Sequence, residues 1–233
     1  MELNVRQQEI LDVLYETGKI SVAELAKRLY VTEMTIRRDL SSMEKSGFLK
    51  RYHGGAVLMV NQREMPLSHR IMFDENEKKA LAKKCLPFLH DGMTVFIDSS
   101  STCQYLIPHV ATYRNMKIIT NSVKAVLTAT SLHIPCVLIG GDYYEQDMCL
   151  VGSIAEQCAR ELNVDIAFFT TAAYSADGVI SDFDEKQLFI RKIILKNSAQ
   201  RVFLCEKNKI GKKMLHTLCR GEDLTAVITV DDF

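Results

Sequence analysis

Apolar residues at helical spacing predict three short helices in the first 47 residues. The first helix has its apolar stripe within residues 10–14 and ends at Gly18. Ser21-Val-Ala-Glu24 is a capping-box sequence and predicts the start of the second. Thr32 is an N-cap residue for the third, which ends at a left-handed Gly47. Two short capped helices joined by a tight connection, the second of them amphipathic, are typical of a helix-turn-helix.

The third predicted helix turns a polar face away from its apolar residues, taking about 100° per residue. In a helix-turn-helix the N-terminal half of this helix enters the major groove of DNA. The side chains that we expect to meet base edges are Glu33, Met34, Thr35 and Arg38. Further candidate DNA contacts on this helix, with phosphates expected for the basic ones, are Thr32, Arg37, Ser41 and Lys45. A solvated polar face on a small helical domain is the alternative interpretation.

Alternating apolar residues on both sides of two glycines predict a two-stranded wing over residues 48–57. Polar residues lie at its tip, where a wing touches the DNA backbone. The candidate DNA contacts in the wing are Arg51, Tyr52, His53, Gly54 and Gly55.

Short apolar runs alternate with stretches of helical pattern from residue 91 onward. The expected strands are residues 93–97, 117–120, 135–139, 165–170, 201–205 and 226–230. Such alternation is typical of a mostly parallel sheet with helices on both faces, so we expect a Rossmann-like α/β domain. The expected organisation is a winged helix-turn-helix at residues 1–57, a linker without periodicity at 58–75 and the α/β domain at 76–233.

Polar or glycine-rich turns follow most of the expected strands, and ligands of parallel α/β sheets bind at these carboxyl ends. The turn after residue 97 leads into a helix, where backbone N–H groups and hydroxyls form an anion site. Its residues are Asp98, Ser99, Ser100, Ser101 and Thr102. The other candidate ligand contacts are Asn121, Gly140, Gly141, Gly152, Asp177 and Lys209. For each of them, a simple helix cap or turn is the alternative interpretation.

The composition, 47% hydrophobic and 25% charged, is that of a soluble globular protein and excludes a disordered or collagen-like chain. Basic and acidic residues balance at 29 each, which excludes indiscriminate coating of nucleic acid. Residues 28–57 nevertheless carry six basic and three acidic side chains, concentrated on the third helix and the wing.

Cysteine and histidine spacing gives no sign of a metal site. The seven cysteines form no C-x-x-C pair and the six histidines show no ligand spacing, so we expect reduced thiols and no metal. No stretch approaches the roughly 20 apolar residues that cross a bilayer. The first residues lack the pattern of a secretory signal, so we expect a cytoplasmic protein.

Thr35-Ile-Arg-Arg-Asp-Leu40, followed by Gly47 and by His53-Gly-Gly-Ala56, closely resembles the winged helix-turn-helix of DeoR-family transcriptional regulators. The resemblance implies that Thr35, Arg37 and Arg38 contact operator DNA, that residues 53–56 form the wing, and that Asp39 holds Arg37, Arg38 or a backbone amide. It also implies a non-enzymatic regulator, usually a repressor, which acts as a dimer or larger homo-oligomer on double-stranded DNA and needs no cofactor.

The resemblance continues into the second half. Effector domains of this family look like ribose-5-phosphate isomerase and usually bind a phosphorylated sugar or related metabolite. Their phosphate loop, D-x-G-[ST]-T, aligns with Asp98 to Thr102. The resemblance therefore implies control of a carbohydrate-metabolism operon by such an effector.

This chain departs from the family pattern at four places. Ser100 replaces the loop glycine, residues 170–173 replace a glycine-bearing turn, Ile190 replaces a helix lysine, and Glu206 replaces an aspartate. Two alternatives therefore stay open. One is a DNA-binding oligomer whose second domain has lost its ligand response; the other is a sugar-phosphate isomerase-type enzyme.

Overall fold

The computed structural model describes residues 3–58, 67–71 and 74–230. The chain divides into two compact units, residues 1–70 and 71–233. Much of the expected linker, residues 58–75, lies outside the described residues, but its described part includes one short helix, α4 (Leu67–Arg70).

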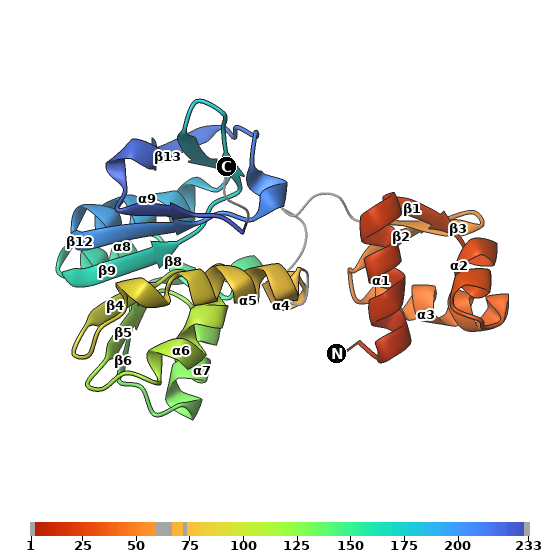
Figure 1. Ribbon diagram of the computed structural model, residues 1–233, viewed down its shortest axis with the longest axis horizontal. Helices are drawn as coiled ribbons and strands as arrows, with labels where there is room; N and C mark the ends of the chain where they lie inside the picture. Colours follow the sequence, from red (N-terminus) through yellow and green to blue (C-terminus); the bar gives the residue numbers. More distant parts are fainter. Residues whose placement is uncertain (1–2, 59–66, 72–73, 231–233) are drawn as a thin grey trace. The chain divides into compact units, whose positions relative to one another are not determined.

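The first unit combines helices α1 to α4 with a small antiparallel sheet (Figure 1). Its elements before α4 are α1 (Val5–Thr17), β1 (Lys19–Ser21), α2 (Val22–Arg28), α3 (Glu33–Lys45), β2 (Leu49–Tyr52) and β3 (Gly55–Leu58). The sheet order is β1-β3-β2, so β3 is the central strand. The sequence did not indicate β1, because three residues are too short for an alternating pattern and pairing with β3 defines the strand.

Helix ends in this unit follow local hydrogen-bond chemistry. The Ser21 side chain accepts a bond from the Glu24 amide at 3.1 Å, but the reciprocal bond of the expected capping box is absent among the described residues. A complete capping box forms instead between Asn4 and Gln7 at the start of α1. At the end of α3, Gly47 has φ +78° and donates to the carbonyl of Glu44, as the left-handed cap requires.

The second unit begins with α5 and contains all the parallel strands. Its helices are α5 (Glu75–Lys84), α6 (Ile107–Val110), α7 (Val123–Ser131), α8 (Ser153–Arg160) and α9 (Glu185–Lys196). Its 3-10 turns are η1 (Leu86–Phe88), η2 (Cys103–Leu106), η3 (Glu145–Asp147), η4 (Lys207–Lys209) and η5 (Gly221–Asp223). Its parallel strands are β4 (Thr94–Ile97), β5 (Lys117–Thr120), β6 (Cys136–Leu138), β9 (Val164–Phe169), β12 (Ser198–Leu204) and β14 (Ala226–Ile228).

The six parallel strands form one sheet in the order β14-β12-β9-β4-β5-β6. Counted along the chain, this is the Rossmann order, with the reversal between β4 and β9. Helices α5, α6 and α7 cover one face, and α8 and α9 cover the other (Figure 1). Each face has its own hydrophobic core, led by Val95, Ile97 and Phe168 on one side and by Phe96, Phe169 and Phe203 on the other. The structure therefore confirms the expected α/β class and all six expected strands.

Five short strands of this unit were not expected from the sequence. They are β7 (Asp142–Tyr144), β8 (Cys149–Val151), β10 (Ala173–Tyr174), β11 (Val179–Asp182) and β13 (His216–Arg220). They form antiparallel additions, β7-β8 and β10-β11-β13, whose two to five residues are too few to show a period. Asp177 consequently lies in the turn of the β10–β11 hairpin, and the expectation that it follows a strand of the parallel sheet was wrong.

Candidate functional site

Helix α3 is fixed to the first unit by apolar packing and by one buried ion pair. Ile36, Leu40 and Met43 are buried, as their spacing predicts. Asp39 is buried as well and accepts two bonds from Arg6 of α1, at 2.6 Å from Nε and 3.3 Å from Nη2. The expected role of Asp39 in holding Arg37, Arg38 or a backbone amide was wrong, because among the described residues its carboxylate bonds to Arg6 instead. The hydrogen bond to Asp39 raises the pKa of Arg6 above its usual value.

The opposite face of α3 presents side chains to solvent. Met34 is 79% exposed, and Glu33, Arg38 and Lys45 are exposed too. Arg38 makes no hydrogen bond or ion pair with any described residue, so its guanidinium is available to a partner. Arg37 is instead paired with Glu33 one turn earlier, at 2.6 Å. The N-cap Thr32 shares a hydrogen bond of 2.9 Å with the hydroxyl of Thr35.

The wing is tied to α3 and to β1. Arg51 donates to the hydroxyl of Ser41 on α3 through its guanidinium and to Glu44 through its amide. Tyr52 crosses the sheet and donates to the carbonyl of Ile20 at 3.3 Å. A side chain at Gly55 would collide with this carbonyl and with the Tyr52 ring, which explains the glycine. His53 and Lys50 lie exposed at the hairpin. The structure thus brings the predicted contacts of helix and wing into one unit with a rigid frame.

In the second unit, Asp98 lies at the end of β4, beside the reversal of strand order where ligands of such sheets bind. Its carboxylate is 1% exposed. One oxygen accepts from the Ser100 amide at 2.9 Å, and the other accepts from the Thr170 amide at 3.2 Å. Asp98 therefore holds together the two loops that follow the neighbouring strands β4 and β9.

Arg191 of α9 brings a buried cation to the same place. Its guanidinium lies 3.2 Å from Asp98, 2.9 Å from Asp182 and 2.9 Å from the side-chain oxygen of Gln187. Gln187 also accepts from the Ser99 hydroxyl at 2.7 Å and donates to Asp147. The two carboxylates raise the pKa of Arg191 against the opposing effect of burial, which is the largest single influence.

The replacement of the family's helix lysine by Ile190 does not remove the positive charge from this site. Ile190 is a core residue, 1% exposed, and the adjacent Arg191 supplies the charged group. We did not select Arg191, Gln187, Asp182, Asp147 or Lys78 from the sequence. A signal was present, because Gln187 and Arg191 lie four residues apart on the apolar stripe of α9. Lys78 similarly lies on the buried face of α5 with Leu81.

A second buried cluster surrounds Glu206, after β12. Its carboxylate lies 2.7 Å from Lys209 and 3.9 Å from Lys78, and it accepts from the Thr102 hydroxyl at 2.6 Å. Burial alone would raise the pKa of Glu206, but the two lysines and the hydrogen bonds outweigh it and lower the pKa to about 2. Lys209 also donates to Thr170 at 2.8 Å, which connects this cluster to the loop held by Asp98.

The loop from Asp98 to Thr102 is almost completely buried. Ser100 is not among the positive-φ residues, so the loop needs no left-handed backbone where the family has glycine. The Ser100 hydroxyl accepts from the Cys103 amide at 3.1 Å. The amides of Ser101 and Thr102 have no hydrogen-bond partner among the described residues. They are the unused donors of the loop.

Other expected ligand contacts serve the packing of the β7–β8 hairpin. Asn121 donates to the carbonyl of Leu150. A Cβ at Gly141 would lie 2.5 Å from the Val151 carbonyl oxygen, and one at Gly152 would lie 2.5 Å from Asp142. Of the three glycines expected at the ligand, only Gly140 faces open space.

Asp177 is hydrogen-bonded to Ser175 and lies 3.7 Å from Lys213, and these contacts lower its pKa.

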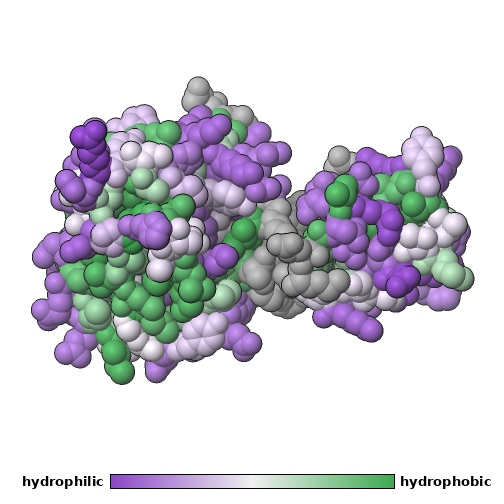
Figure 2. Space-filling model, turned by 90° about the horizontal axis from the view of Figure 1, so that it is seen from below, coloured by the Kyte–Doolittle hydropathy of each residue, from purple (hydrophilic) through white to green (hydrophobic). Residues whose placement is uncertain are grey.

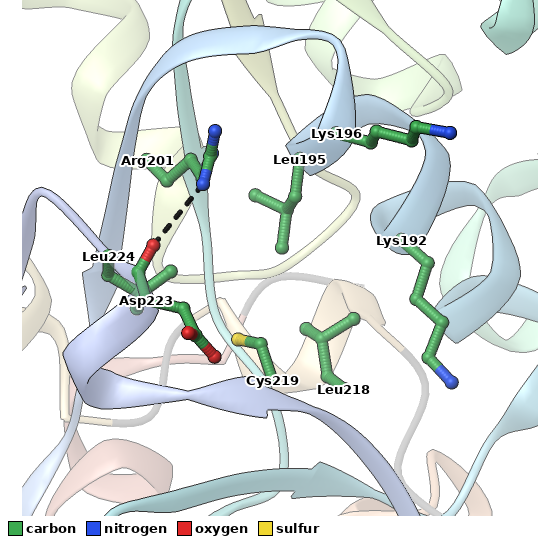
Figure 3. A pocket seen from close by; sticks show the side chains of 8 residues that line it. All are labelled: Lys192, Leu195, Lys196, Arg201, Leu218, Cys219, Asp223 and Leu224. Atoms are coloured by element: carbon green, nitrogen blue, oxygen red, sulfur yellow. Dashed lines mark hydrogen bonds between the residues drawn. The ribbon is translucent and has the colours of Figure 1, made fainter.

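A pocket of about 250 Å³ lies between α9, β12, β13 and η5 (Figure 3). Its lining residues are Lys192, Leu195, Lys196, Arg201, Leu218, Cys219, Asp223 and Leu224. Arg201 donates to the carbonyl of Asp223 at 3.3 Å, while the ammonium groups of Lys192 and Lys196 point outward (Figure 3). None of the expected site residues lines it.

Within the described parts of the chain, no group of His, Cys, Asp and Glu could hold a metal ion. Among the same residues, no helix combines the length and apolar character that crossing a membrane requires. All seven cysteines are free, and burial raises the pKa of Cys85 to about 12.

Comparison with known families matches both units. A DeoR-like helix-turn-helix domain matches residues 6–62, and a DeoR C-terminal sensor domain matches residues 74–231. The lactose phosphotransferase system repressor of Staphylococcus aureus is 30% identical over 234 residues, covering 98% of this chain and 92% of that protein. The HTH-type transcriptional regulator GolR of Listeria innocua is 27% identical, covering 96% of this chain and 89% of that one.

Two solved structures are among those similar to this chain. The eIF2B delta subunit of Chaetomium thermophilum matches with a TM-score of 0.51 at 13% identity, covering 72% of this chain and 59% of that one. Ribose 5-phosphate isomerase A of Methanocaldococcus jannaschii matches with a TM-score of 0.44 at 20% identity, covering 59% of this chain and 55% of that one. The two matched domains lead to one conclusion: the chain belongs to the DeoR family of transcriptional regulators, with an N-terminal helix-turn-helix and a C-terminal sensor domain.

Proposed function

We propose that this protein represses a carbohydrate-metabolism operon by binding double-stranded operator DNA with α3 and the wing. The single observation that carries the proposal is the two-sided character of α3. Its inner side is held by the Arg6–Asp39 ion pair, while Met34 and Arg38 on its outer side are exposed and Arg38 has no partner among the described residues. A rigid helix with unused hydrogen-bond donors is what major-groove reading requires. The lactose phosphotransferase system repressor among its relatives supports the carbohydrate assignment.

The proposed DNA contacts fall into two groups. Glu33, Met34, Thr35 and Arg38 are assigned to base edges, because they lie in the first half of α3. The proposed phosphate contacts or wing contacts are Thr32, Arg37, Ser41, Lys45, Arg51, Tyr52, His53, Gly54 and Gly55. Within this set, Arg51 and Ser41 already bond to each other, so we assign them the joint role of orienting the wing on α3. The proposed place of action is the cytoplasm, where the DNA of the bacterial relatives lies.

The proposed effector is a phosphorylated sugar or related metabolite bound at the carboxyl ends of the neighbouring strands β4 and β9. Supporting it are the amides of Ser101 and Thr102, which have no partner in the described part of the chain, and the nearby cation Lys209. Such an arrangement of amides suits an anion. Because the loop is buried and Lys209 is bonded to Glu206, a ligand would have to rearrange these contacts. That rearrangement is the proposed link between effector binding and DNA affinity. Asp98, Ser99 and Ser100 are assigned to shaping the loop.

We propose that the protein is not an enzyme. An isomerase needs a free, positioned general base. Asp98 is bonded to Arg191 and two amides, and Glu206 is bonded to Lys209 and Thr102, so both carboxylates are committed to structural contacts.

One observation favours a second candidate, a DNA-binding oligomer without ligand response. The buried cations of the site, Arg191, Lys209 and Lys78, all have carboxylate partners already. In this alternative the ion pairs complete the domain and leave no charge for an effector.

The test has two stages. Operator DNA is first selected from a random duplex library with the full chain, and its affinity is measured by fluorescence anisotropy. Sugar phosphates are then screened for thermal stabilisation, which follows RT ln(1 + [L]/Kd), and each stabilising compound is added to the protein–DNA complex. We expect one compound both to stabilise the protein and to release DNA. Failure to enrich any sequence would refute the DNA-binding proposal, whereas enrichment without a stabilising compound would favour the second candidate.

A further inference from the structure

The outer edge of the parallel sheet has an apolar surface. β6 is the last strand of the sheet, and α7 packs against it. Leu127 is 59% exposed, and Leu132, Val137 and Leu138 are each more than one-third exposed. We call these four residues the β6 edge patch. Figure 2 shows apolar surface gathered on the side of the sensor domain where Figure 1 draws α7 and β6.

The same segment carries no formal charge. Residues 125–141, which span most of α7, all of β6 and the turn after it, include no Asp, Glu, Lys or Arg. In a chain with 25% charged residues, a charge-free run of this length on exposed elements is unusual. Proteins normally protect an exposed edge strand with charges or proline inside the strand, because its unpaired backbone invites pairing with another chain. β6 lacks both within residues 136–138, so its edge is unprotected.

The backbone of β6 has hydrogen-bonding groups to offer there. The Pro135 carbonyl and the Ile139 amide bond to β5, so the backbone amide and carbonyl of Val137 between them also point toward β5. By alternation, the amides and carbonyls of Cys136 and Leu138 point away from β5. In the described chain no strand lies on that side. Two antiparallel copies of this edge would satisfy each other through residues 136 and 138.

We propose that β6 pairs with β6 of a second copy of this chain, antiparallel about a two-fold axis at Val137, and that the β6 edge patch completes the interface. The inference rests on the proposed function, since an operator with two half-sites is read by two DNA-binding units. A second copy is favoured as occupant because this pairing is self-complementary, as a two-fold interface must be. The absence of formal charge also means that like-charge repulsion does not oppose it.

The first test measures mass in solution by light scattering after gel filtration, for the full chain and for Val137→Lys. We expect the natural chain to have at least twice its chain mass of 26.4 kDa and the variant to fall to one chain. Leu215→Lys is the matched control, because Leu215 is an exposed leucine of the same unit outside the patch. A natural chain that is monomeric, or a Val137→Lys variant with unchanged mass, would overturn the interface.

The second test gives a positive signal and does not depend on tolerating a buried lysine. Opposite residues on the axis form a non-hydrogen-bonded pair with Cα atoms about 4.5 Å apart, within the range that a disulfide spans. Val137→Cys should therefore form a disulfide-linked dimer under mild oxidation, whereas the natural chain and Leu215→Cys should not. Equal cross-linking of Val137→Cys and Leu215→Cys would also overturn the proposal.

DNA binding is followed separately with a single half-site duplex at high protein concentration. We expect Val137→Lys to bind the half-site like the natural chain and to lose the tighter binding to a two-half-site operator. If both proteins fail on the half-site, the DNA-binding proposal has failed. If both bind and the variant keeps its mass, the interface alone has failed.

Discussion

Replacement of Arg191 tests whether the sensor domain depends on one buried cation. In Arg191→Met, Asp98 and Asp182 keep their burial but lose a guanidinium at 3.2 Å and 2.9 Å. Removing one partner of a buried ion pair costs about 3–5 kcal/mol, because a charge is left without compensation. Out of a typical stability of about 5–15 kcal/mol, this loss would be severe. For a domain of this size it corresponds to a fall in Tm of roughly 10 °C.

The assay is urea unfolding followed by circular dichroism, since the chain has no tryptophan. Arg160→Met is the matched control: Arg160 is likewise a helix arginine in an ion pair, with Glu156 at 3.3 Å, but its side chain is 59% exposed. We expect that control to lose about 0–1 kcal/mol. Adding Asp182→Asn to Arg191→Met should restore part of the loss, because one uncompensated carboxylate is removed. The reasoning is refuted if Arg191→Met and Arg160→Met unfold at the same urea concentration.

Three further predictions concern other parts of the chain. The folded-state pKa of Glu206 is depressed from 4.5 to about 2, so its ionisation contributes about 3 kcal/mol to the stability of the folded protein above pH 4.5, and this contribution is lost as the pH falls toward 2. Urea midpoints at pH 7 and pH 3 should therefore differ less in Glu206→Gln than in the natural chain. An equal difference in the two proteins would contradict this. Gly141→Ala should destabilise the sensor domain by about 1–3 kcal/mol in a thermal melt, because φ is +147° and the new Cβ would lie 2.5 Å from the Val151 carbonyl oxygen. Gly140→Ala, the control, should melt close to the natural chain. Arg6→Met should leave Asp39 unsatisfied at a cost of about 1–3 kcal/mol, visible as faster hydrogen exchange in α3, and unchanged exchange there would argue against the anchor.

The frame of the molecule could be predicted because it depends on local and periodic signals. The strands over residues 117–120 and 93–97 contain short apolar runs, at residues 118–119 and 95–97, and parallel strands buried on both faces give that pattern. Gly47 and Thr32 mark the ends of α3 through capping chemistry that involves only neighbouring residues. These signals need no knowledge of tertiary contacts.

The partners of the buried charges could not be predicted, because they are far apart in the sequence. Asp98 meets Arg191 across 93 positions, and Thr102 meets Glu206 across 104. The Arg6–Asp39 pair, 33 positions apart, was missed for the same reason. Spacing rules describe one helix or strand at a time, so they identify a polar residue on an apolar face without naming what satisfies it.

Two glycines show that the same residue type after a strand can be required by a ligand or by packing within the chain. Gly141 and Gly152 were expected at a ligand, but their space is taken by Val151 and Asp142 of the same domain. A glycine after a strand therefore indicates a close approach without saying whether a ligand or the chain itself approaches.

The central claim is that α3 reads operator DNA through Arg38. It is tested most directly by anisotropy titrations of the natural chain, Arg38→Ala and Lys117→Ala, against a selected operator and its single-base variants. Lys117 is the control, an exposed cation on β5 of the sensor domain. Arg38→Ala should lose about 1–3 kcal/mol of affinity and its preference at one base pair, while Lys117→Ala binds like the natural chain. Equal affinity and equal base preference for Arg38→Ala and the natural chain would contradict the account.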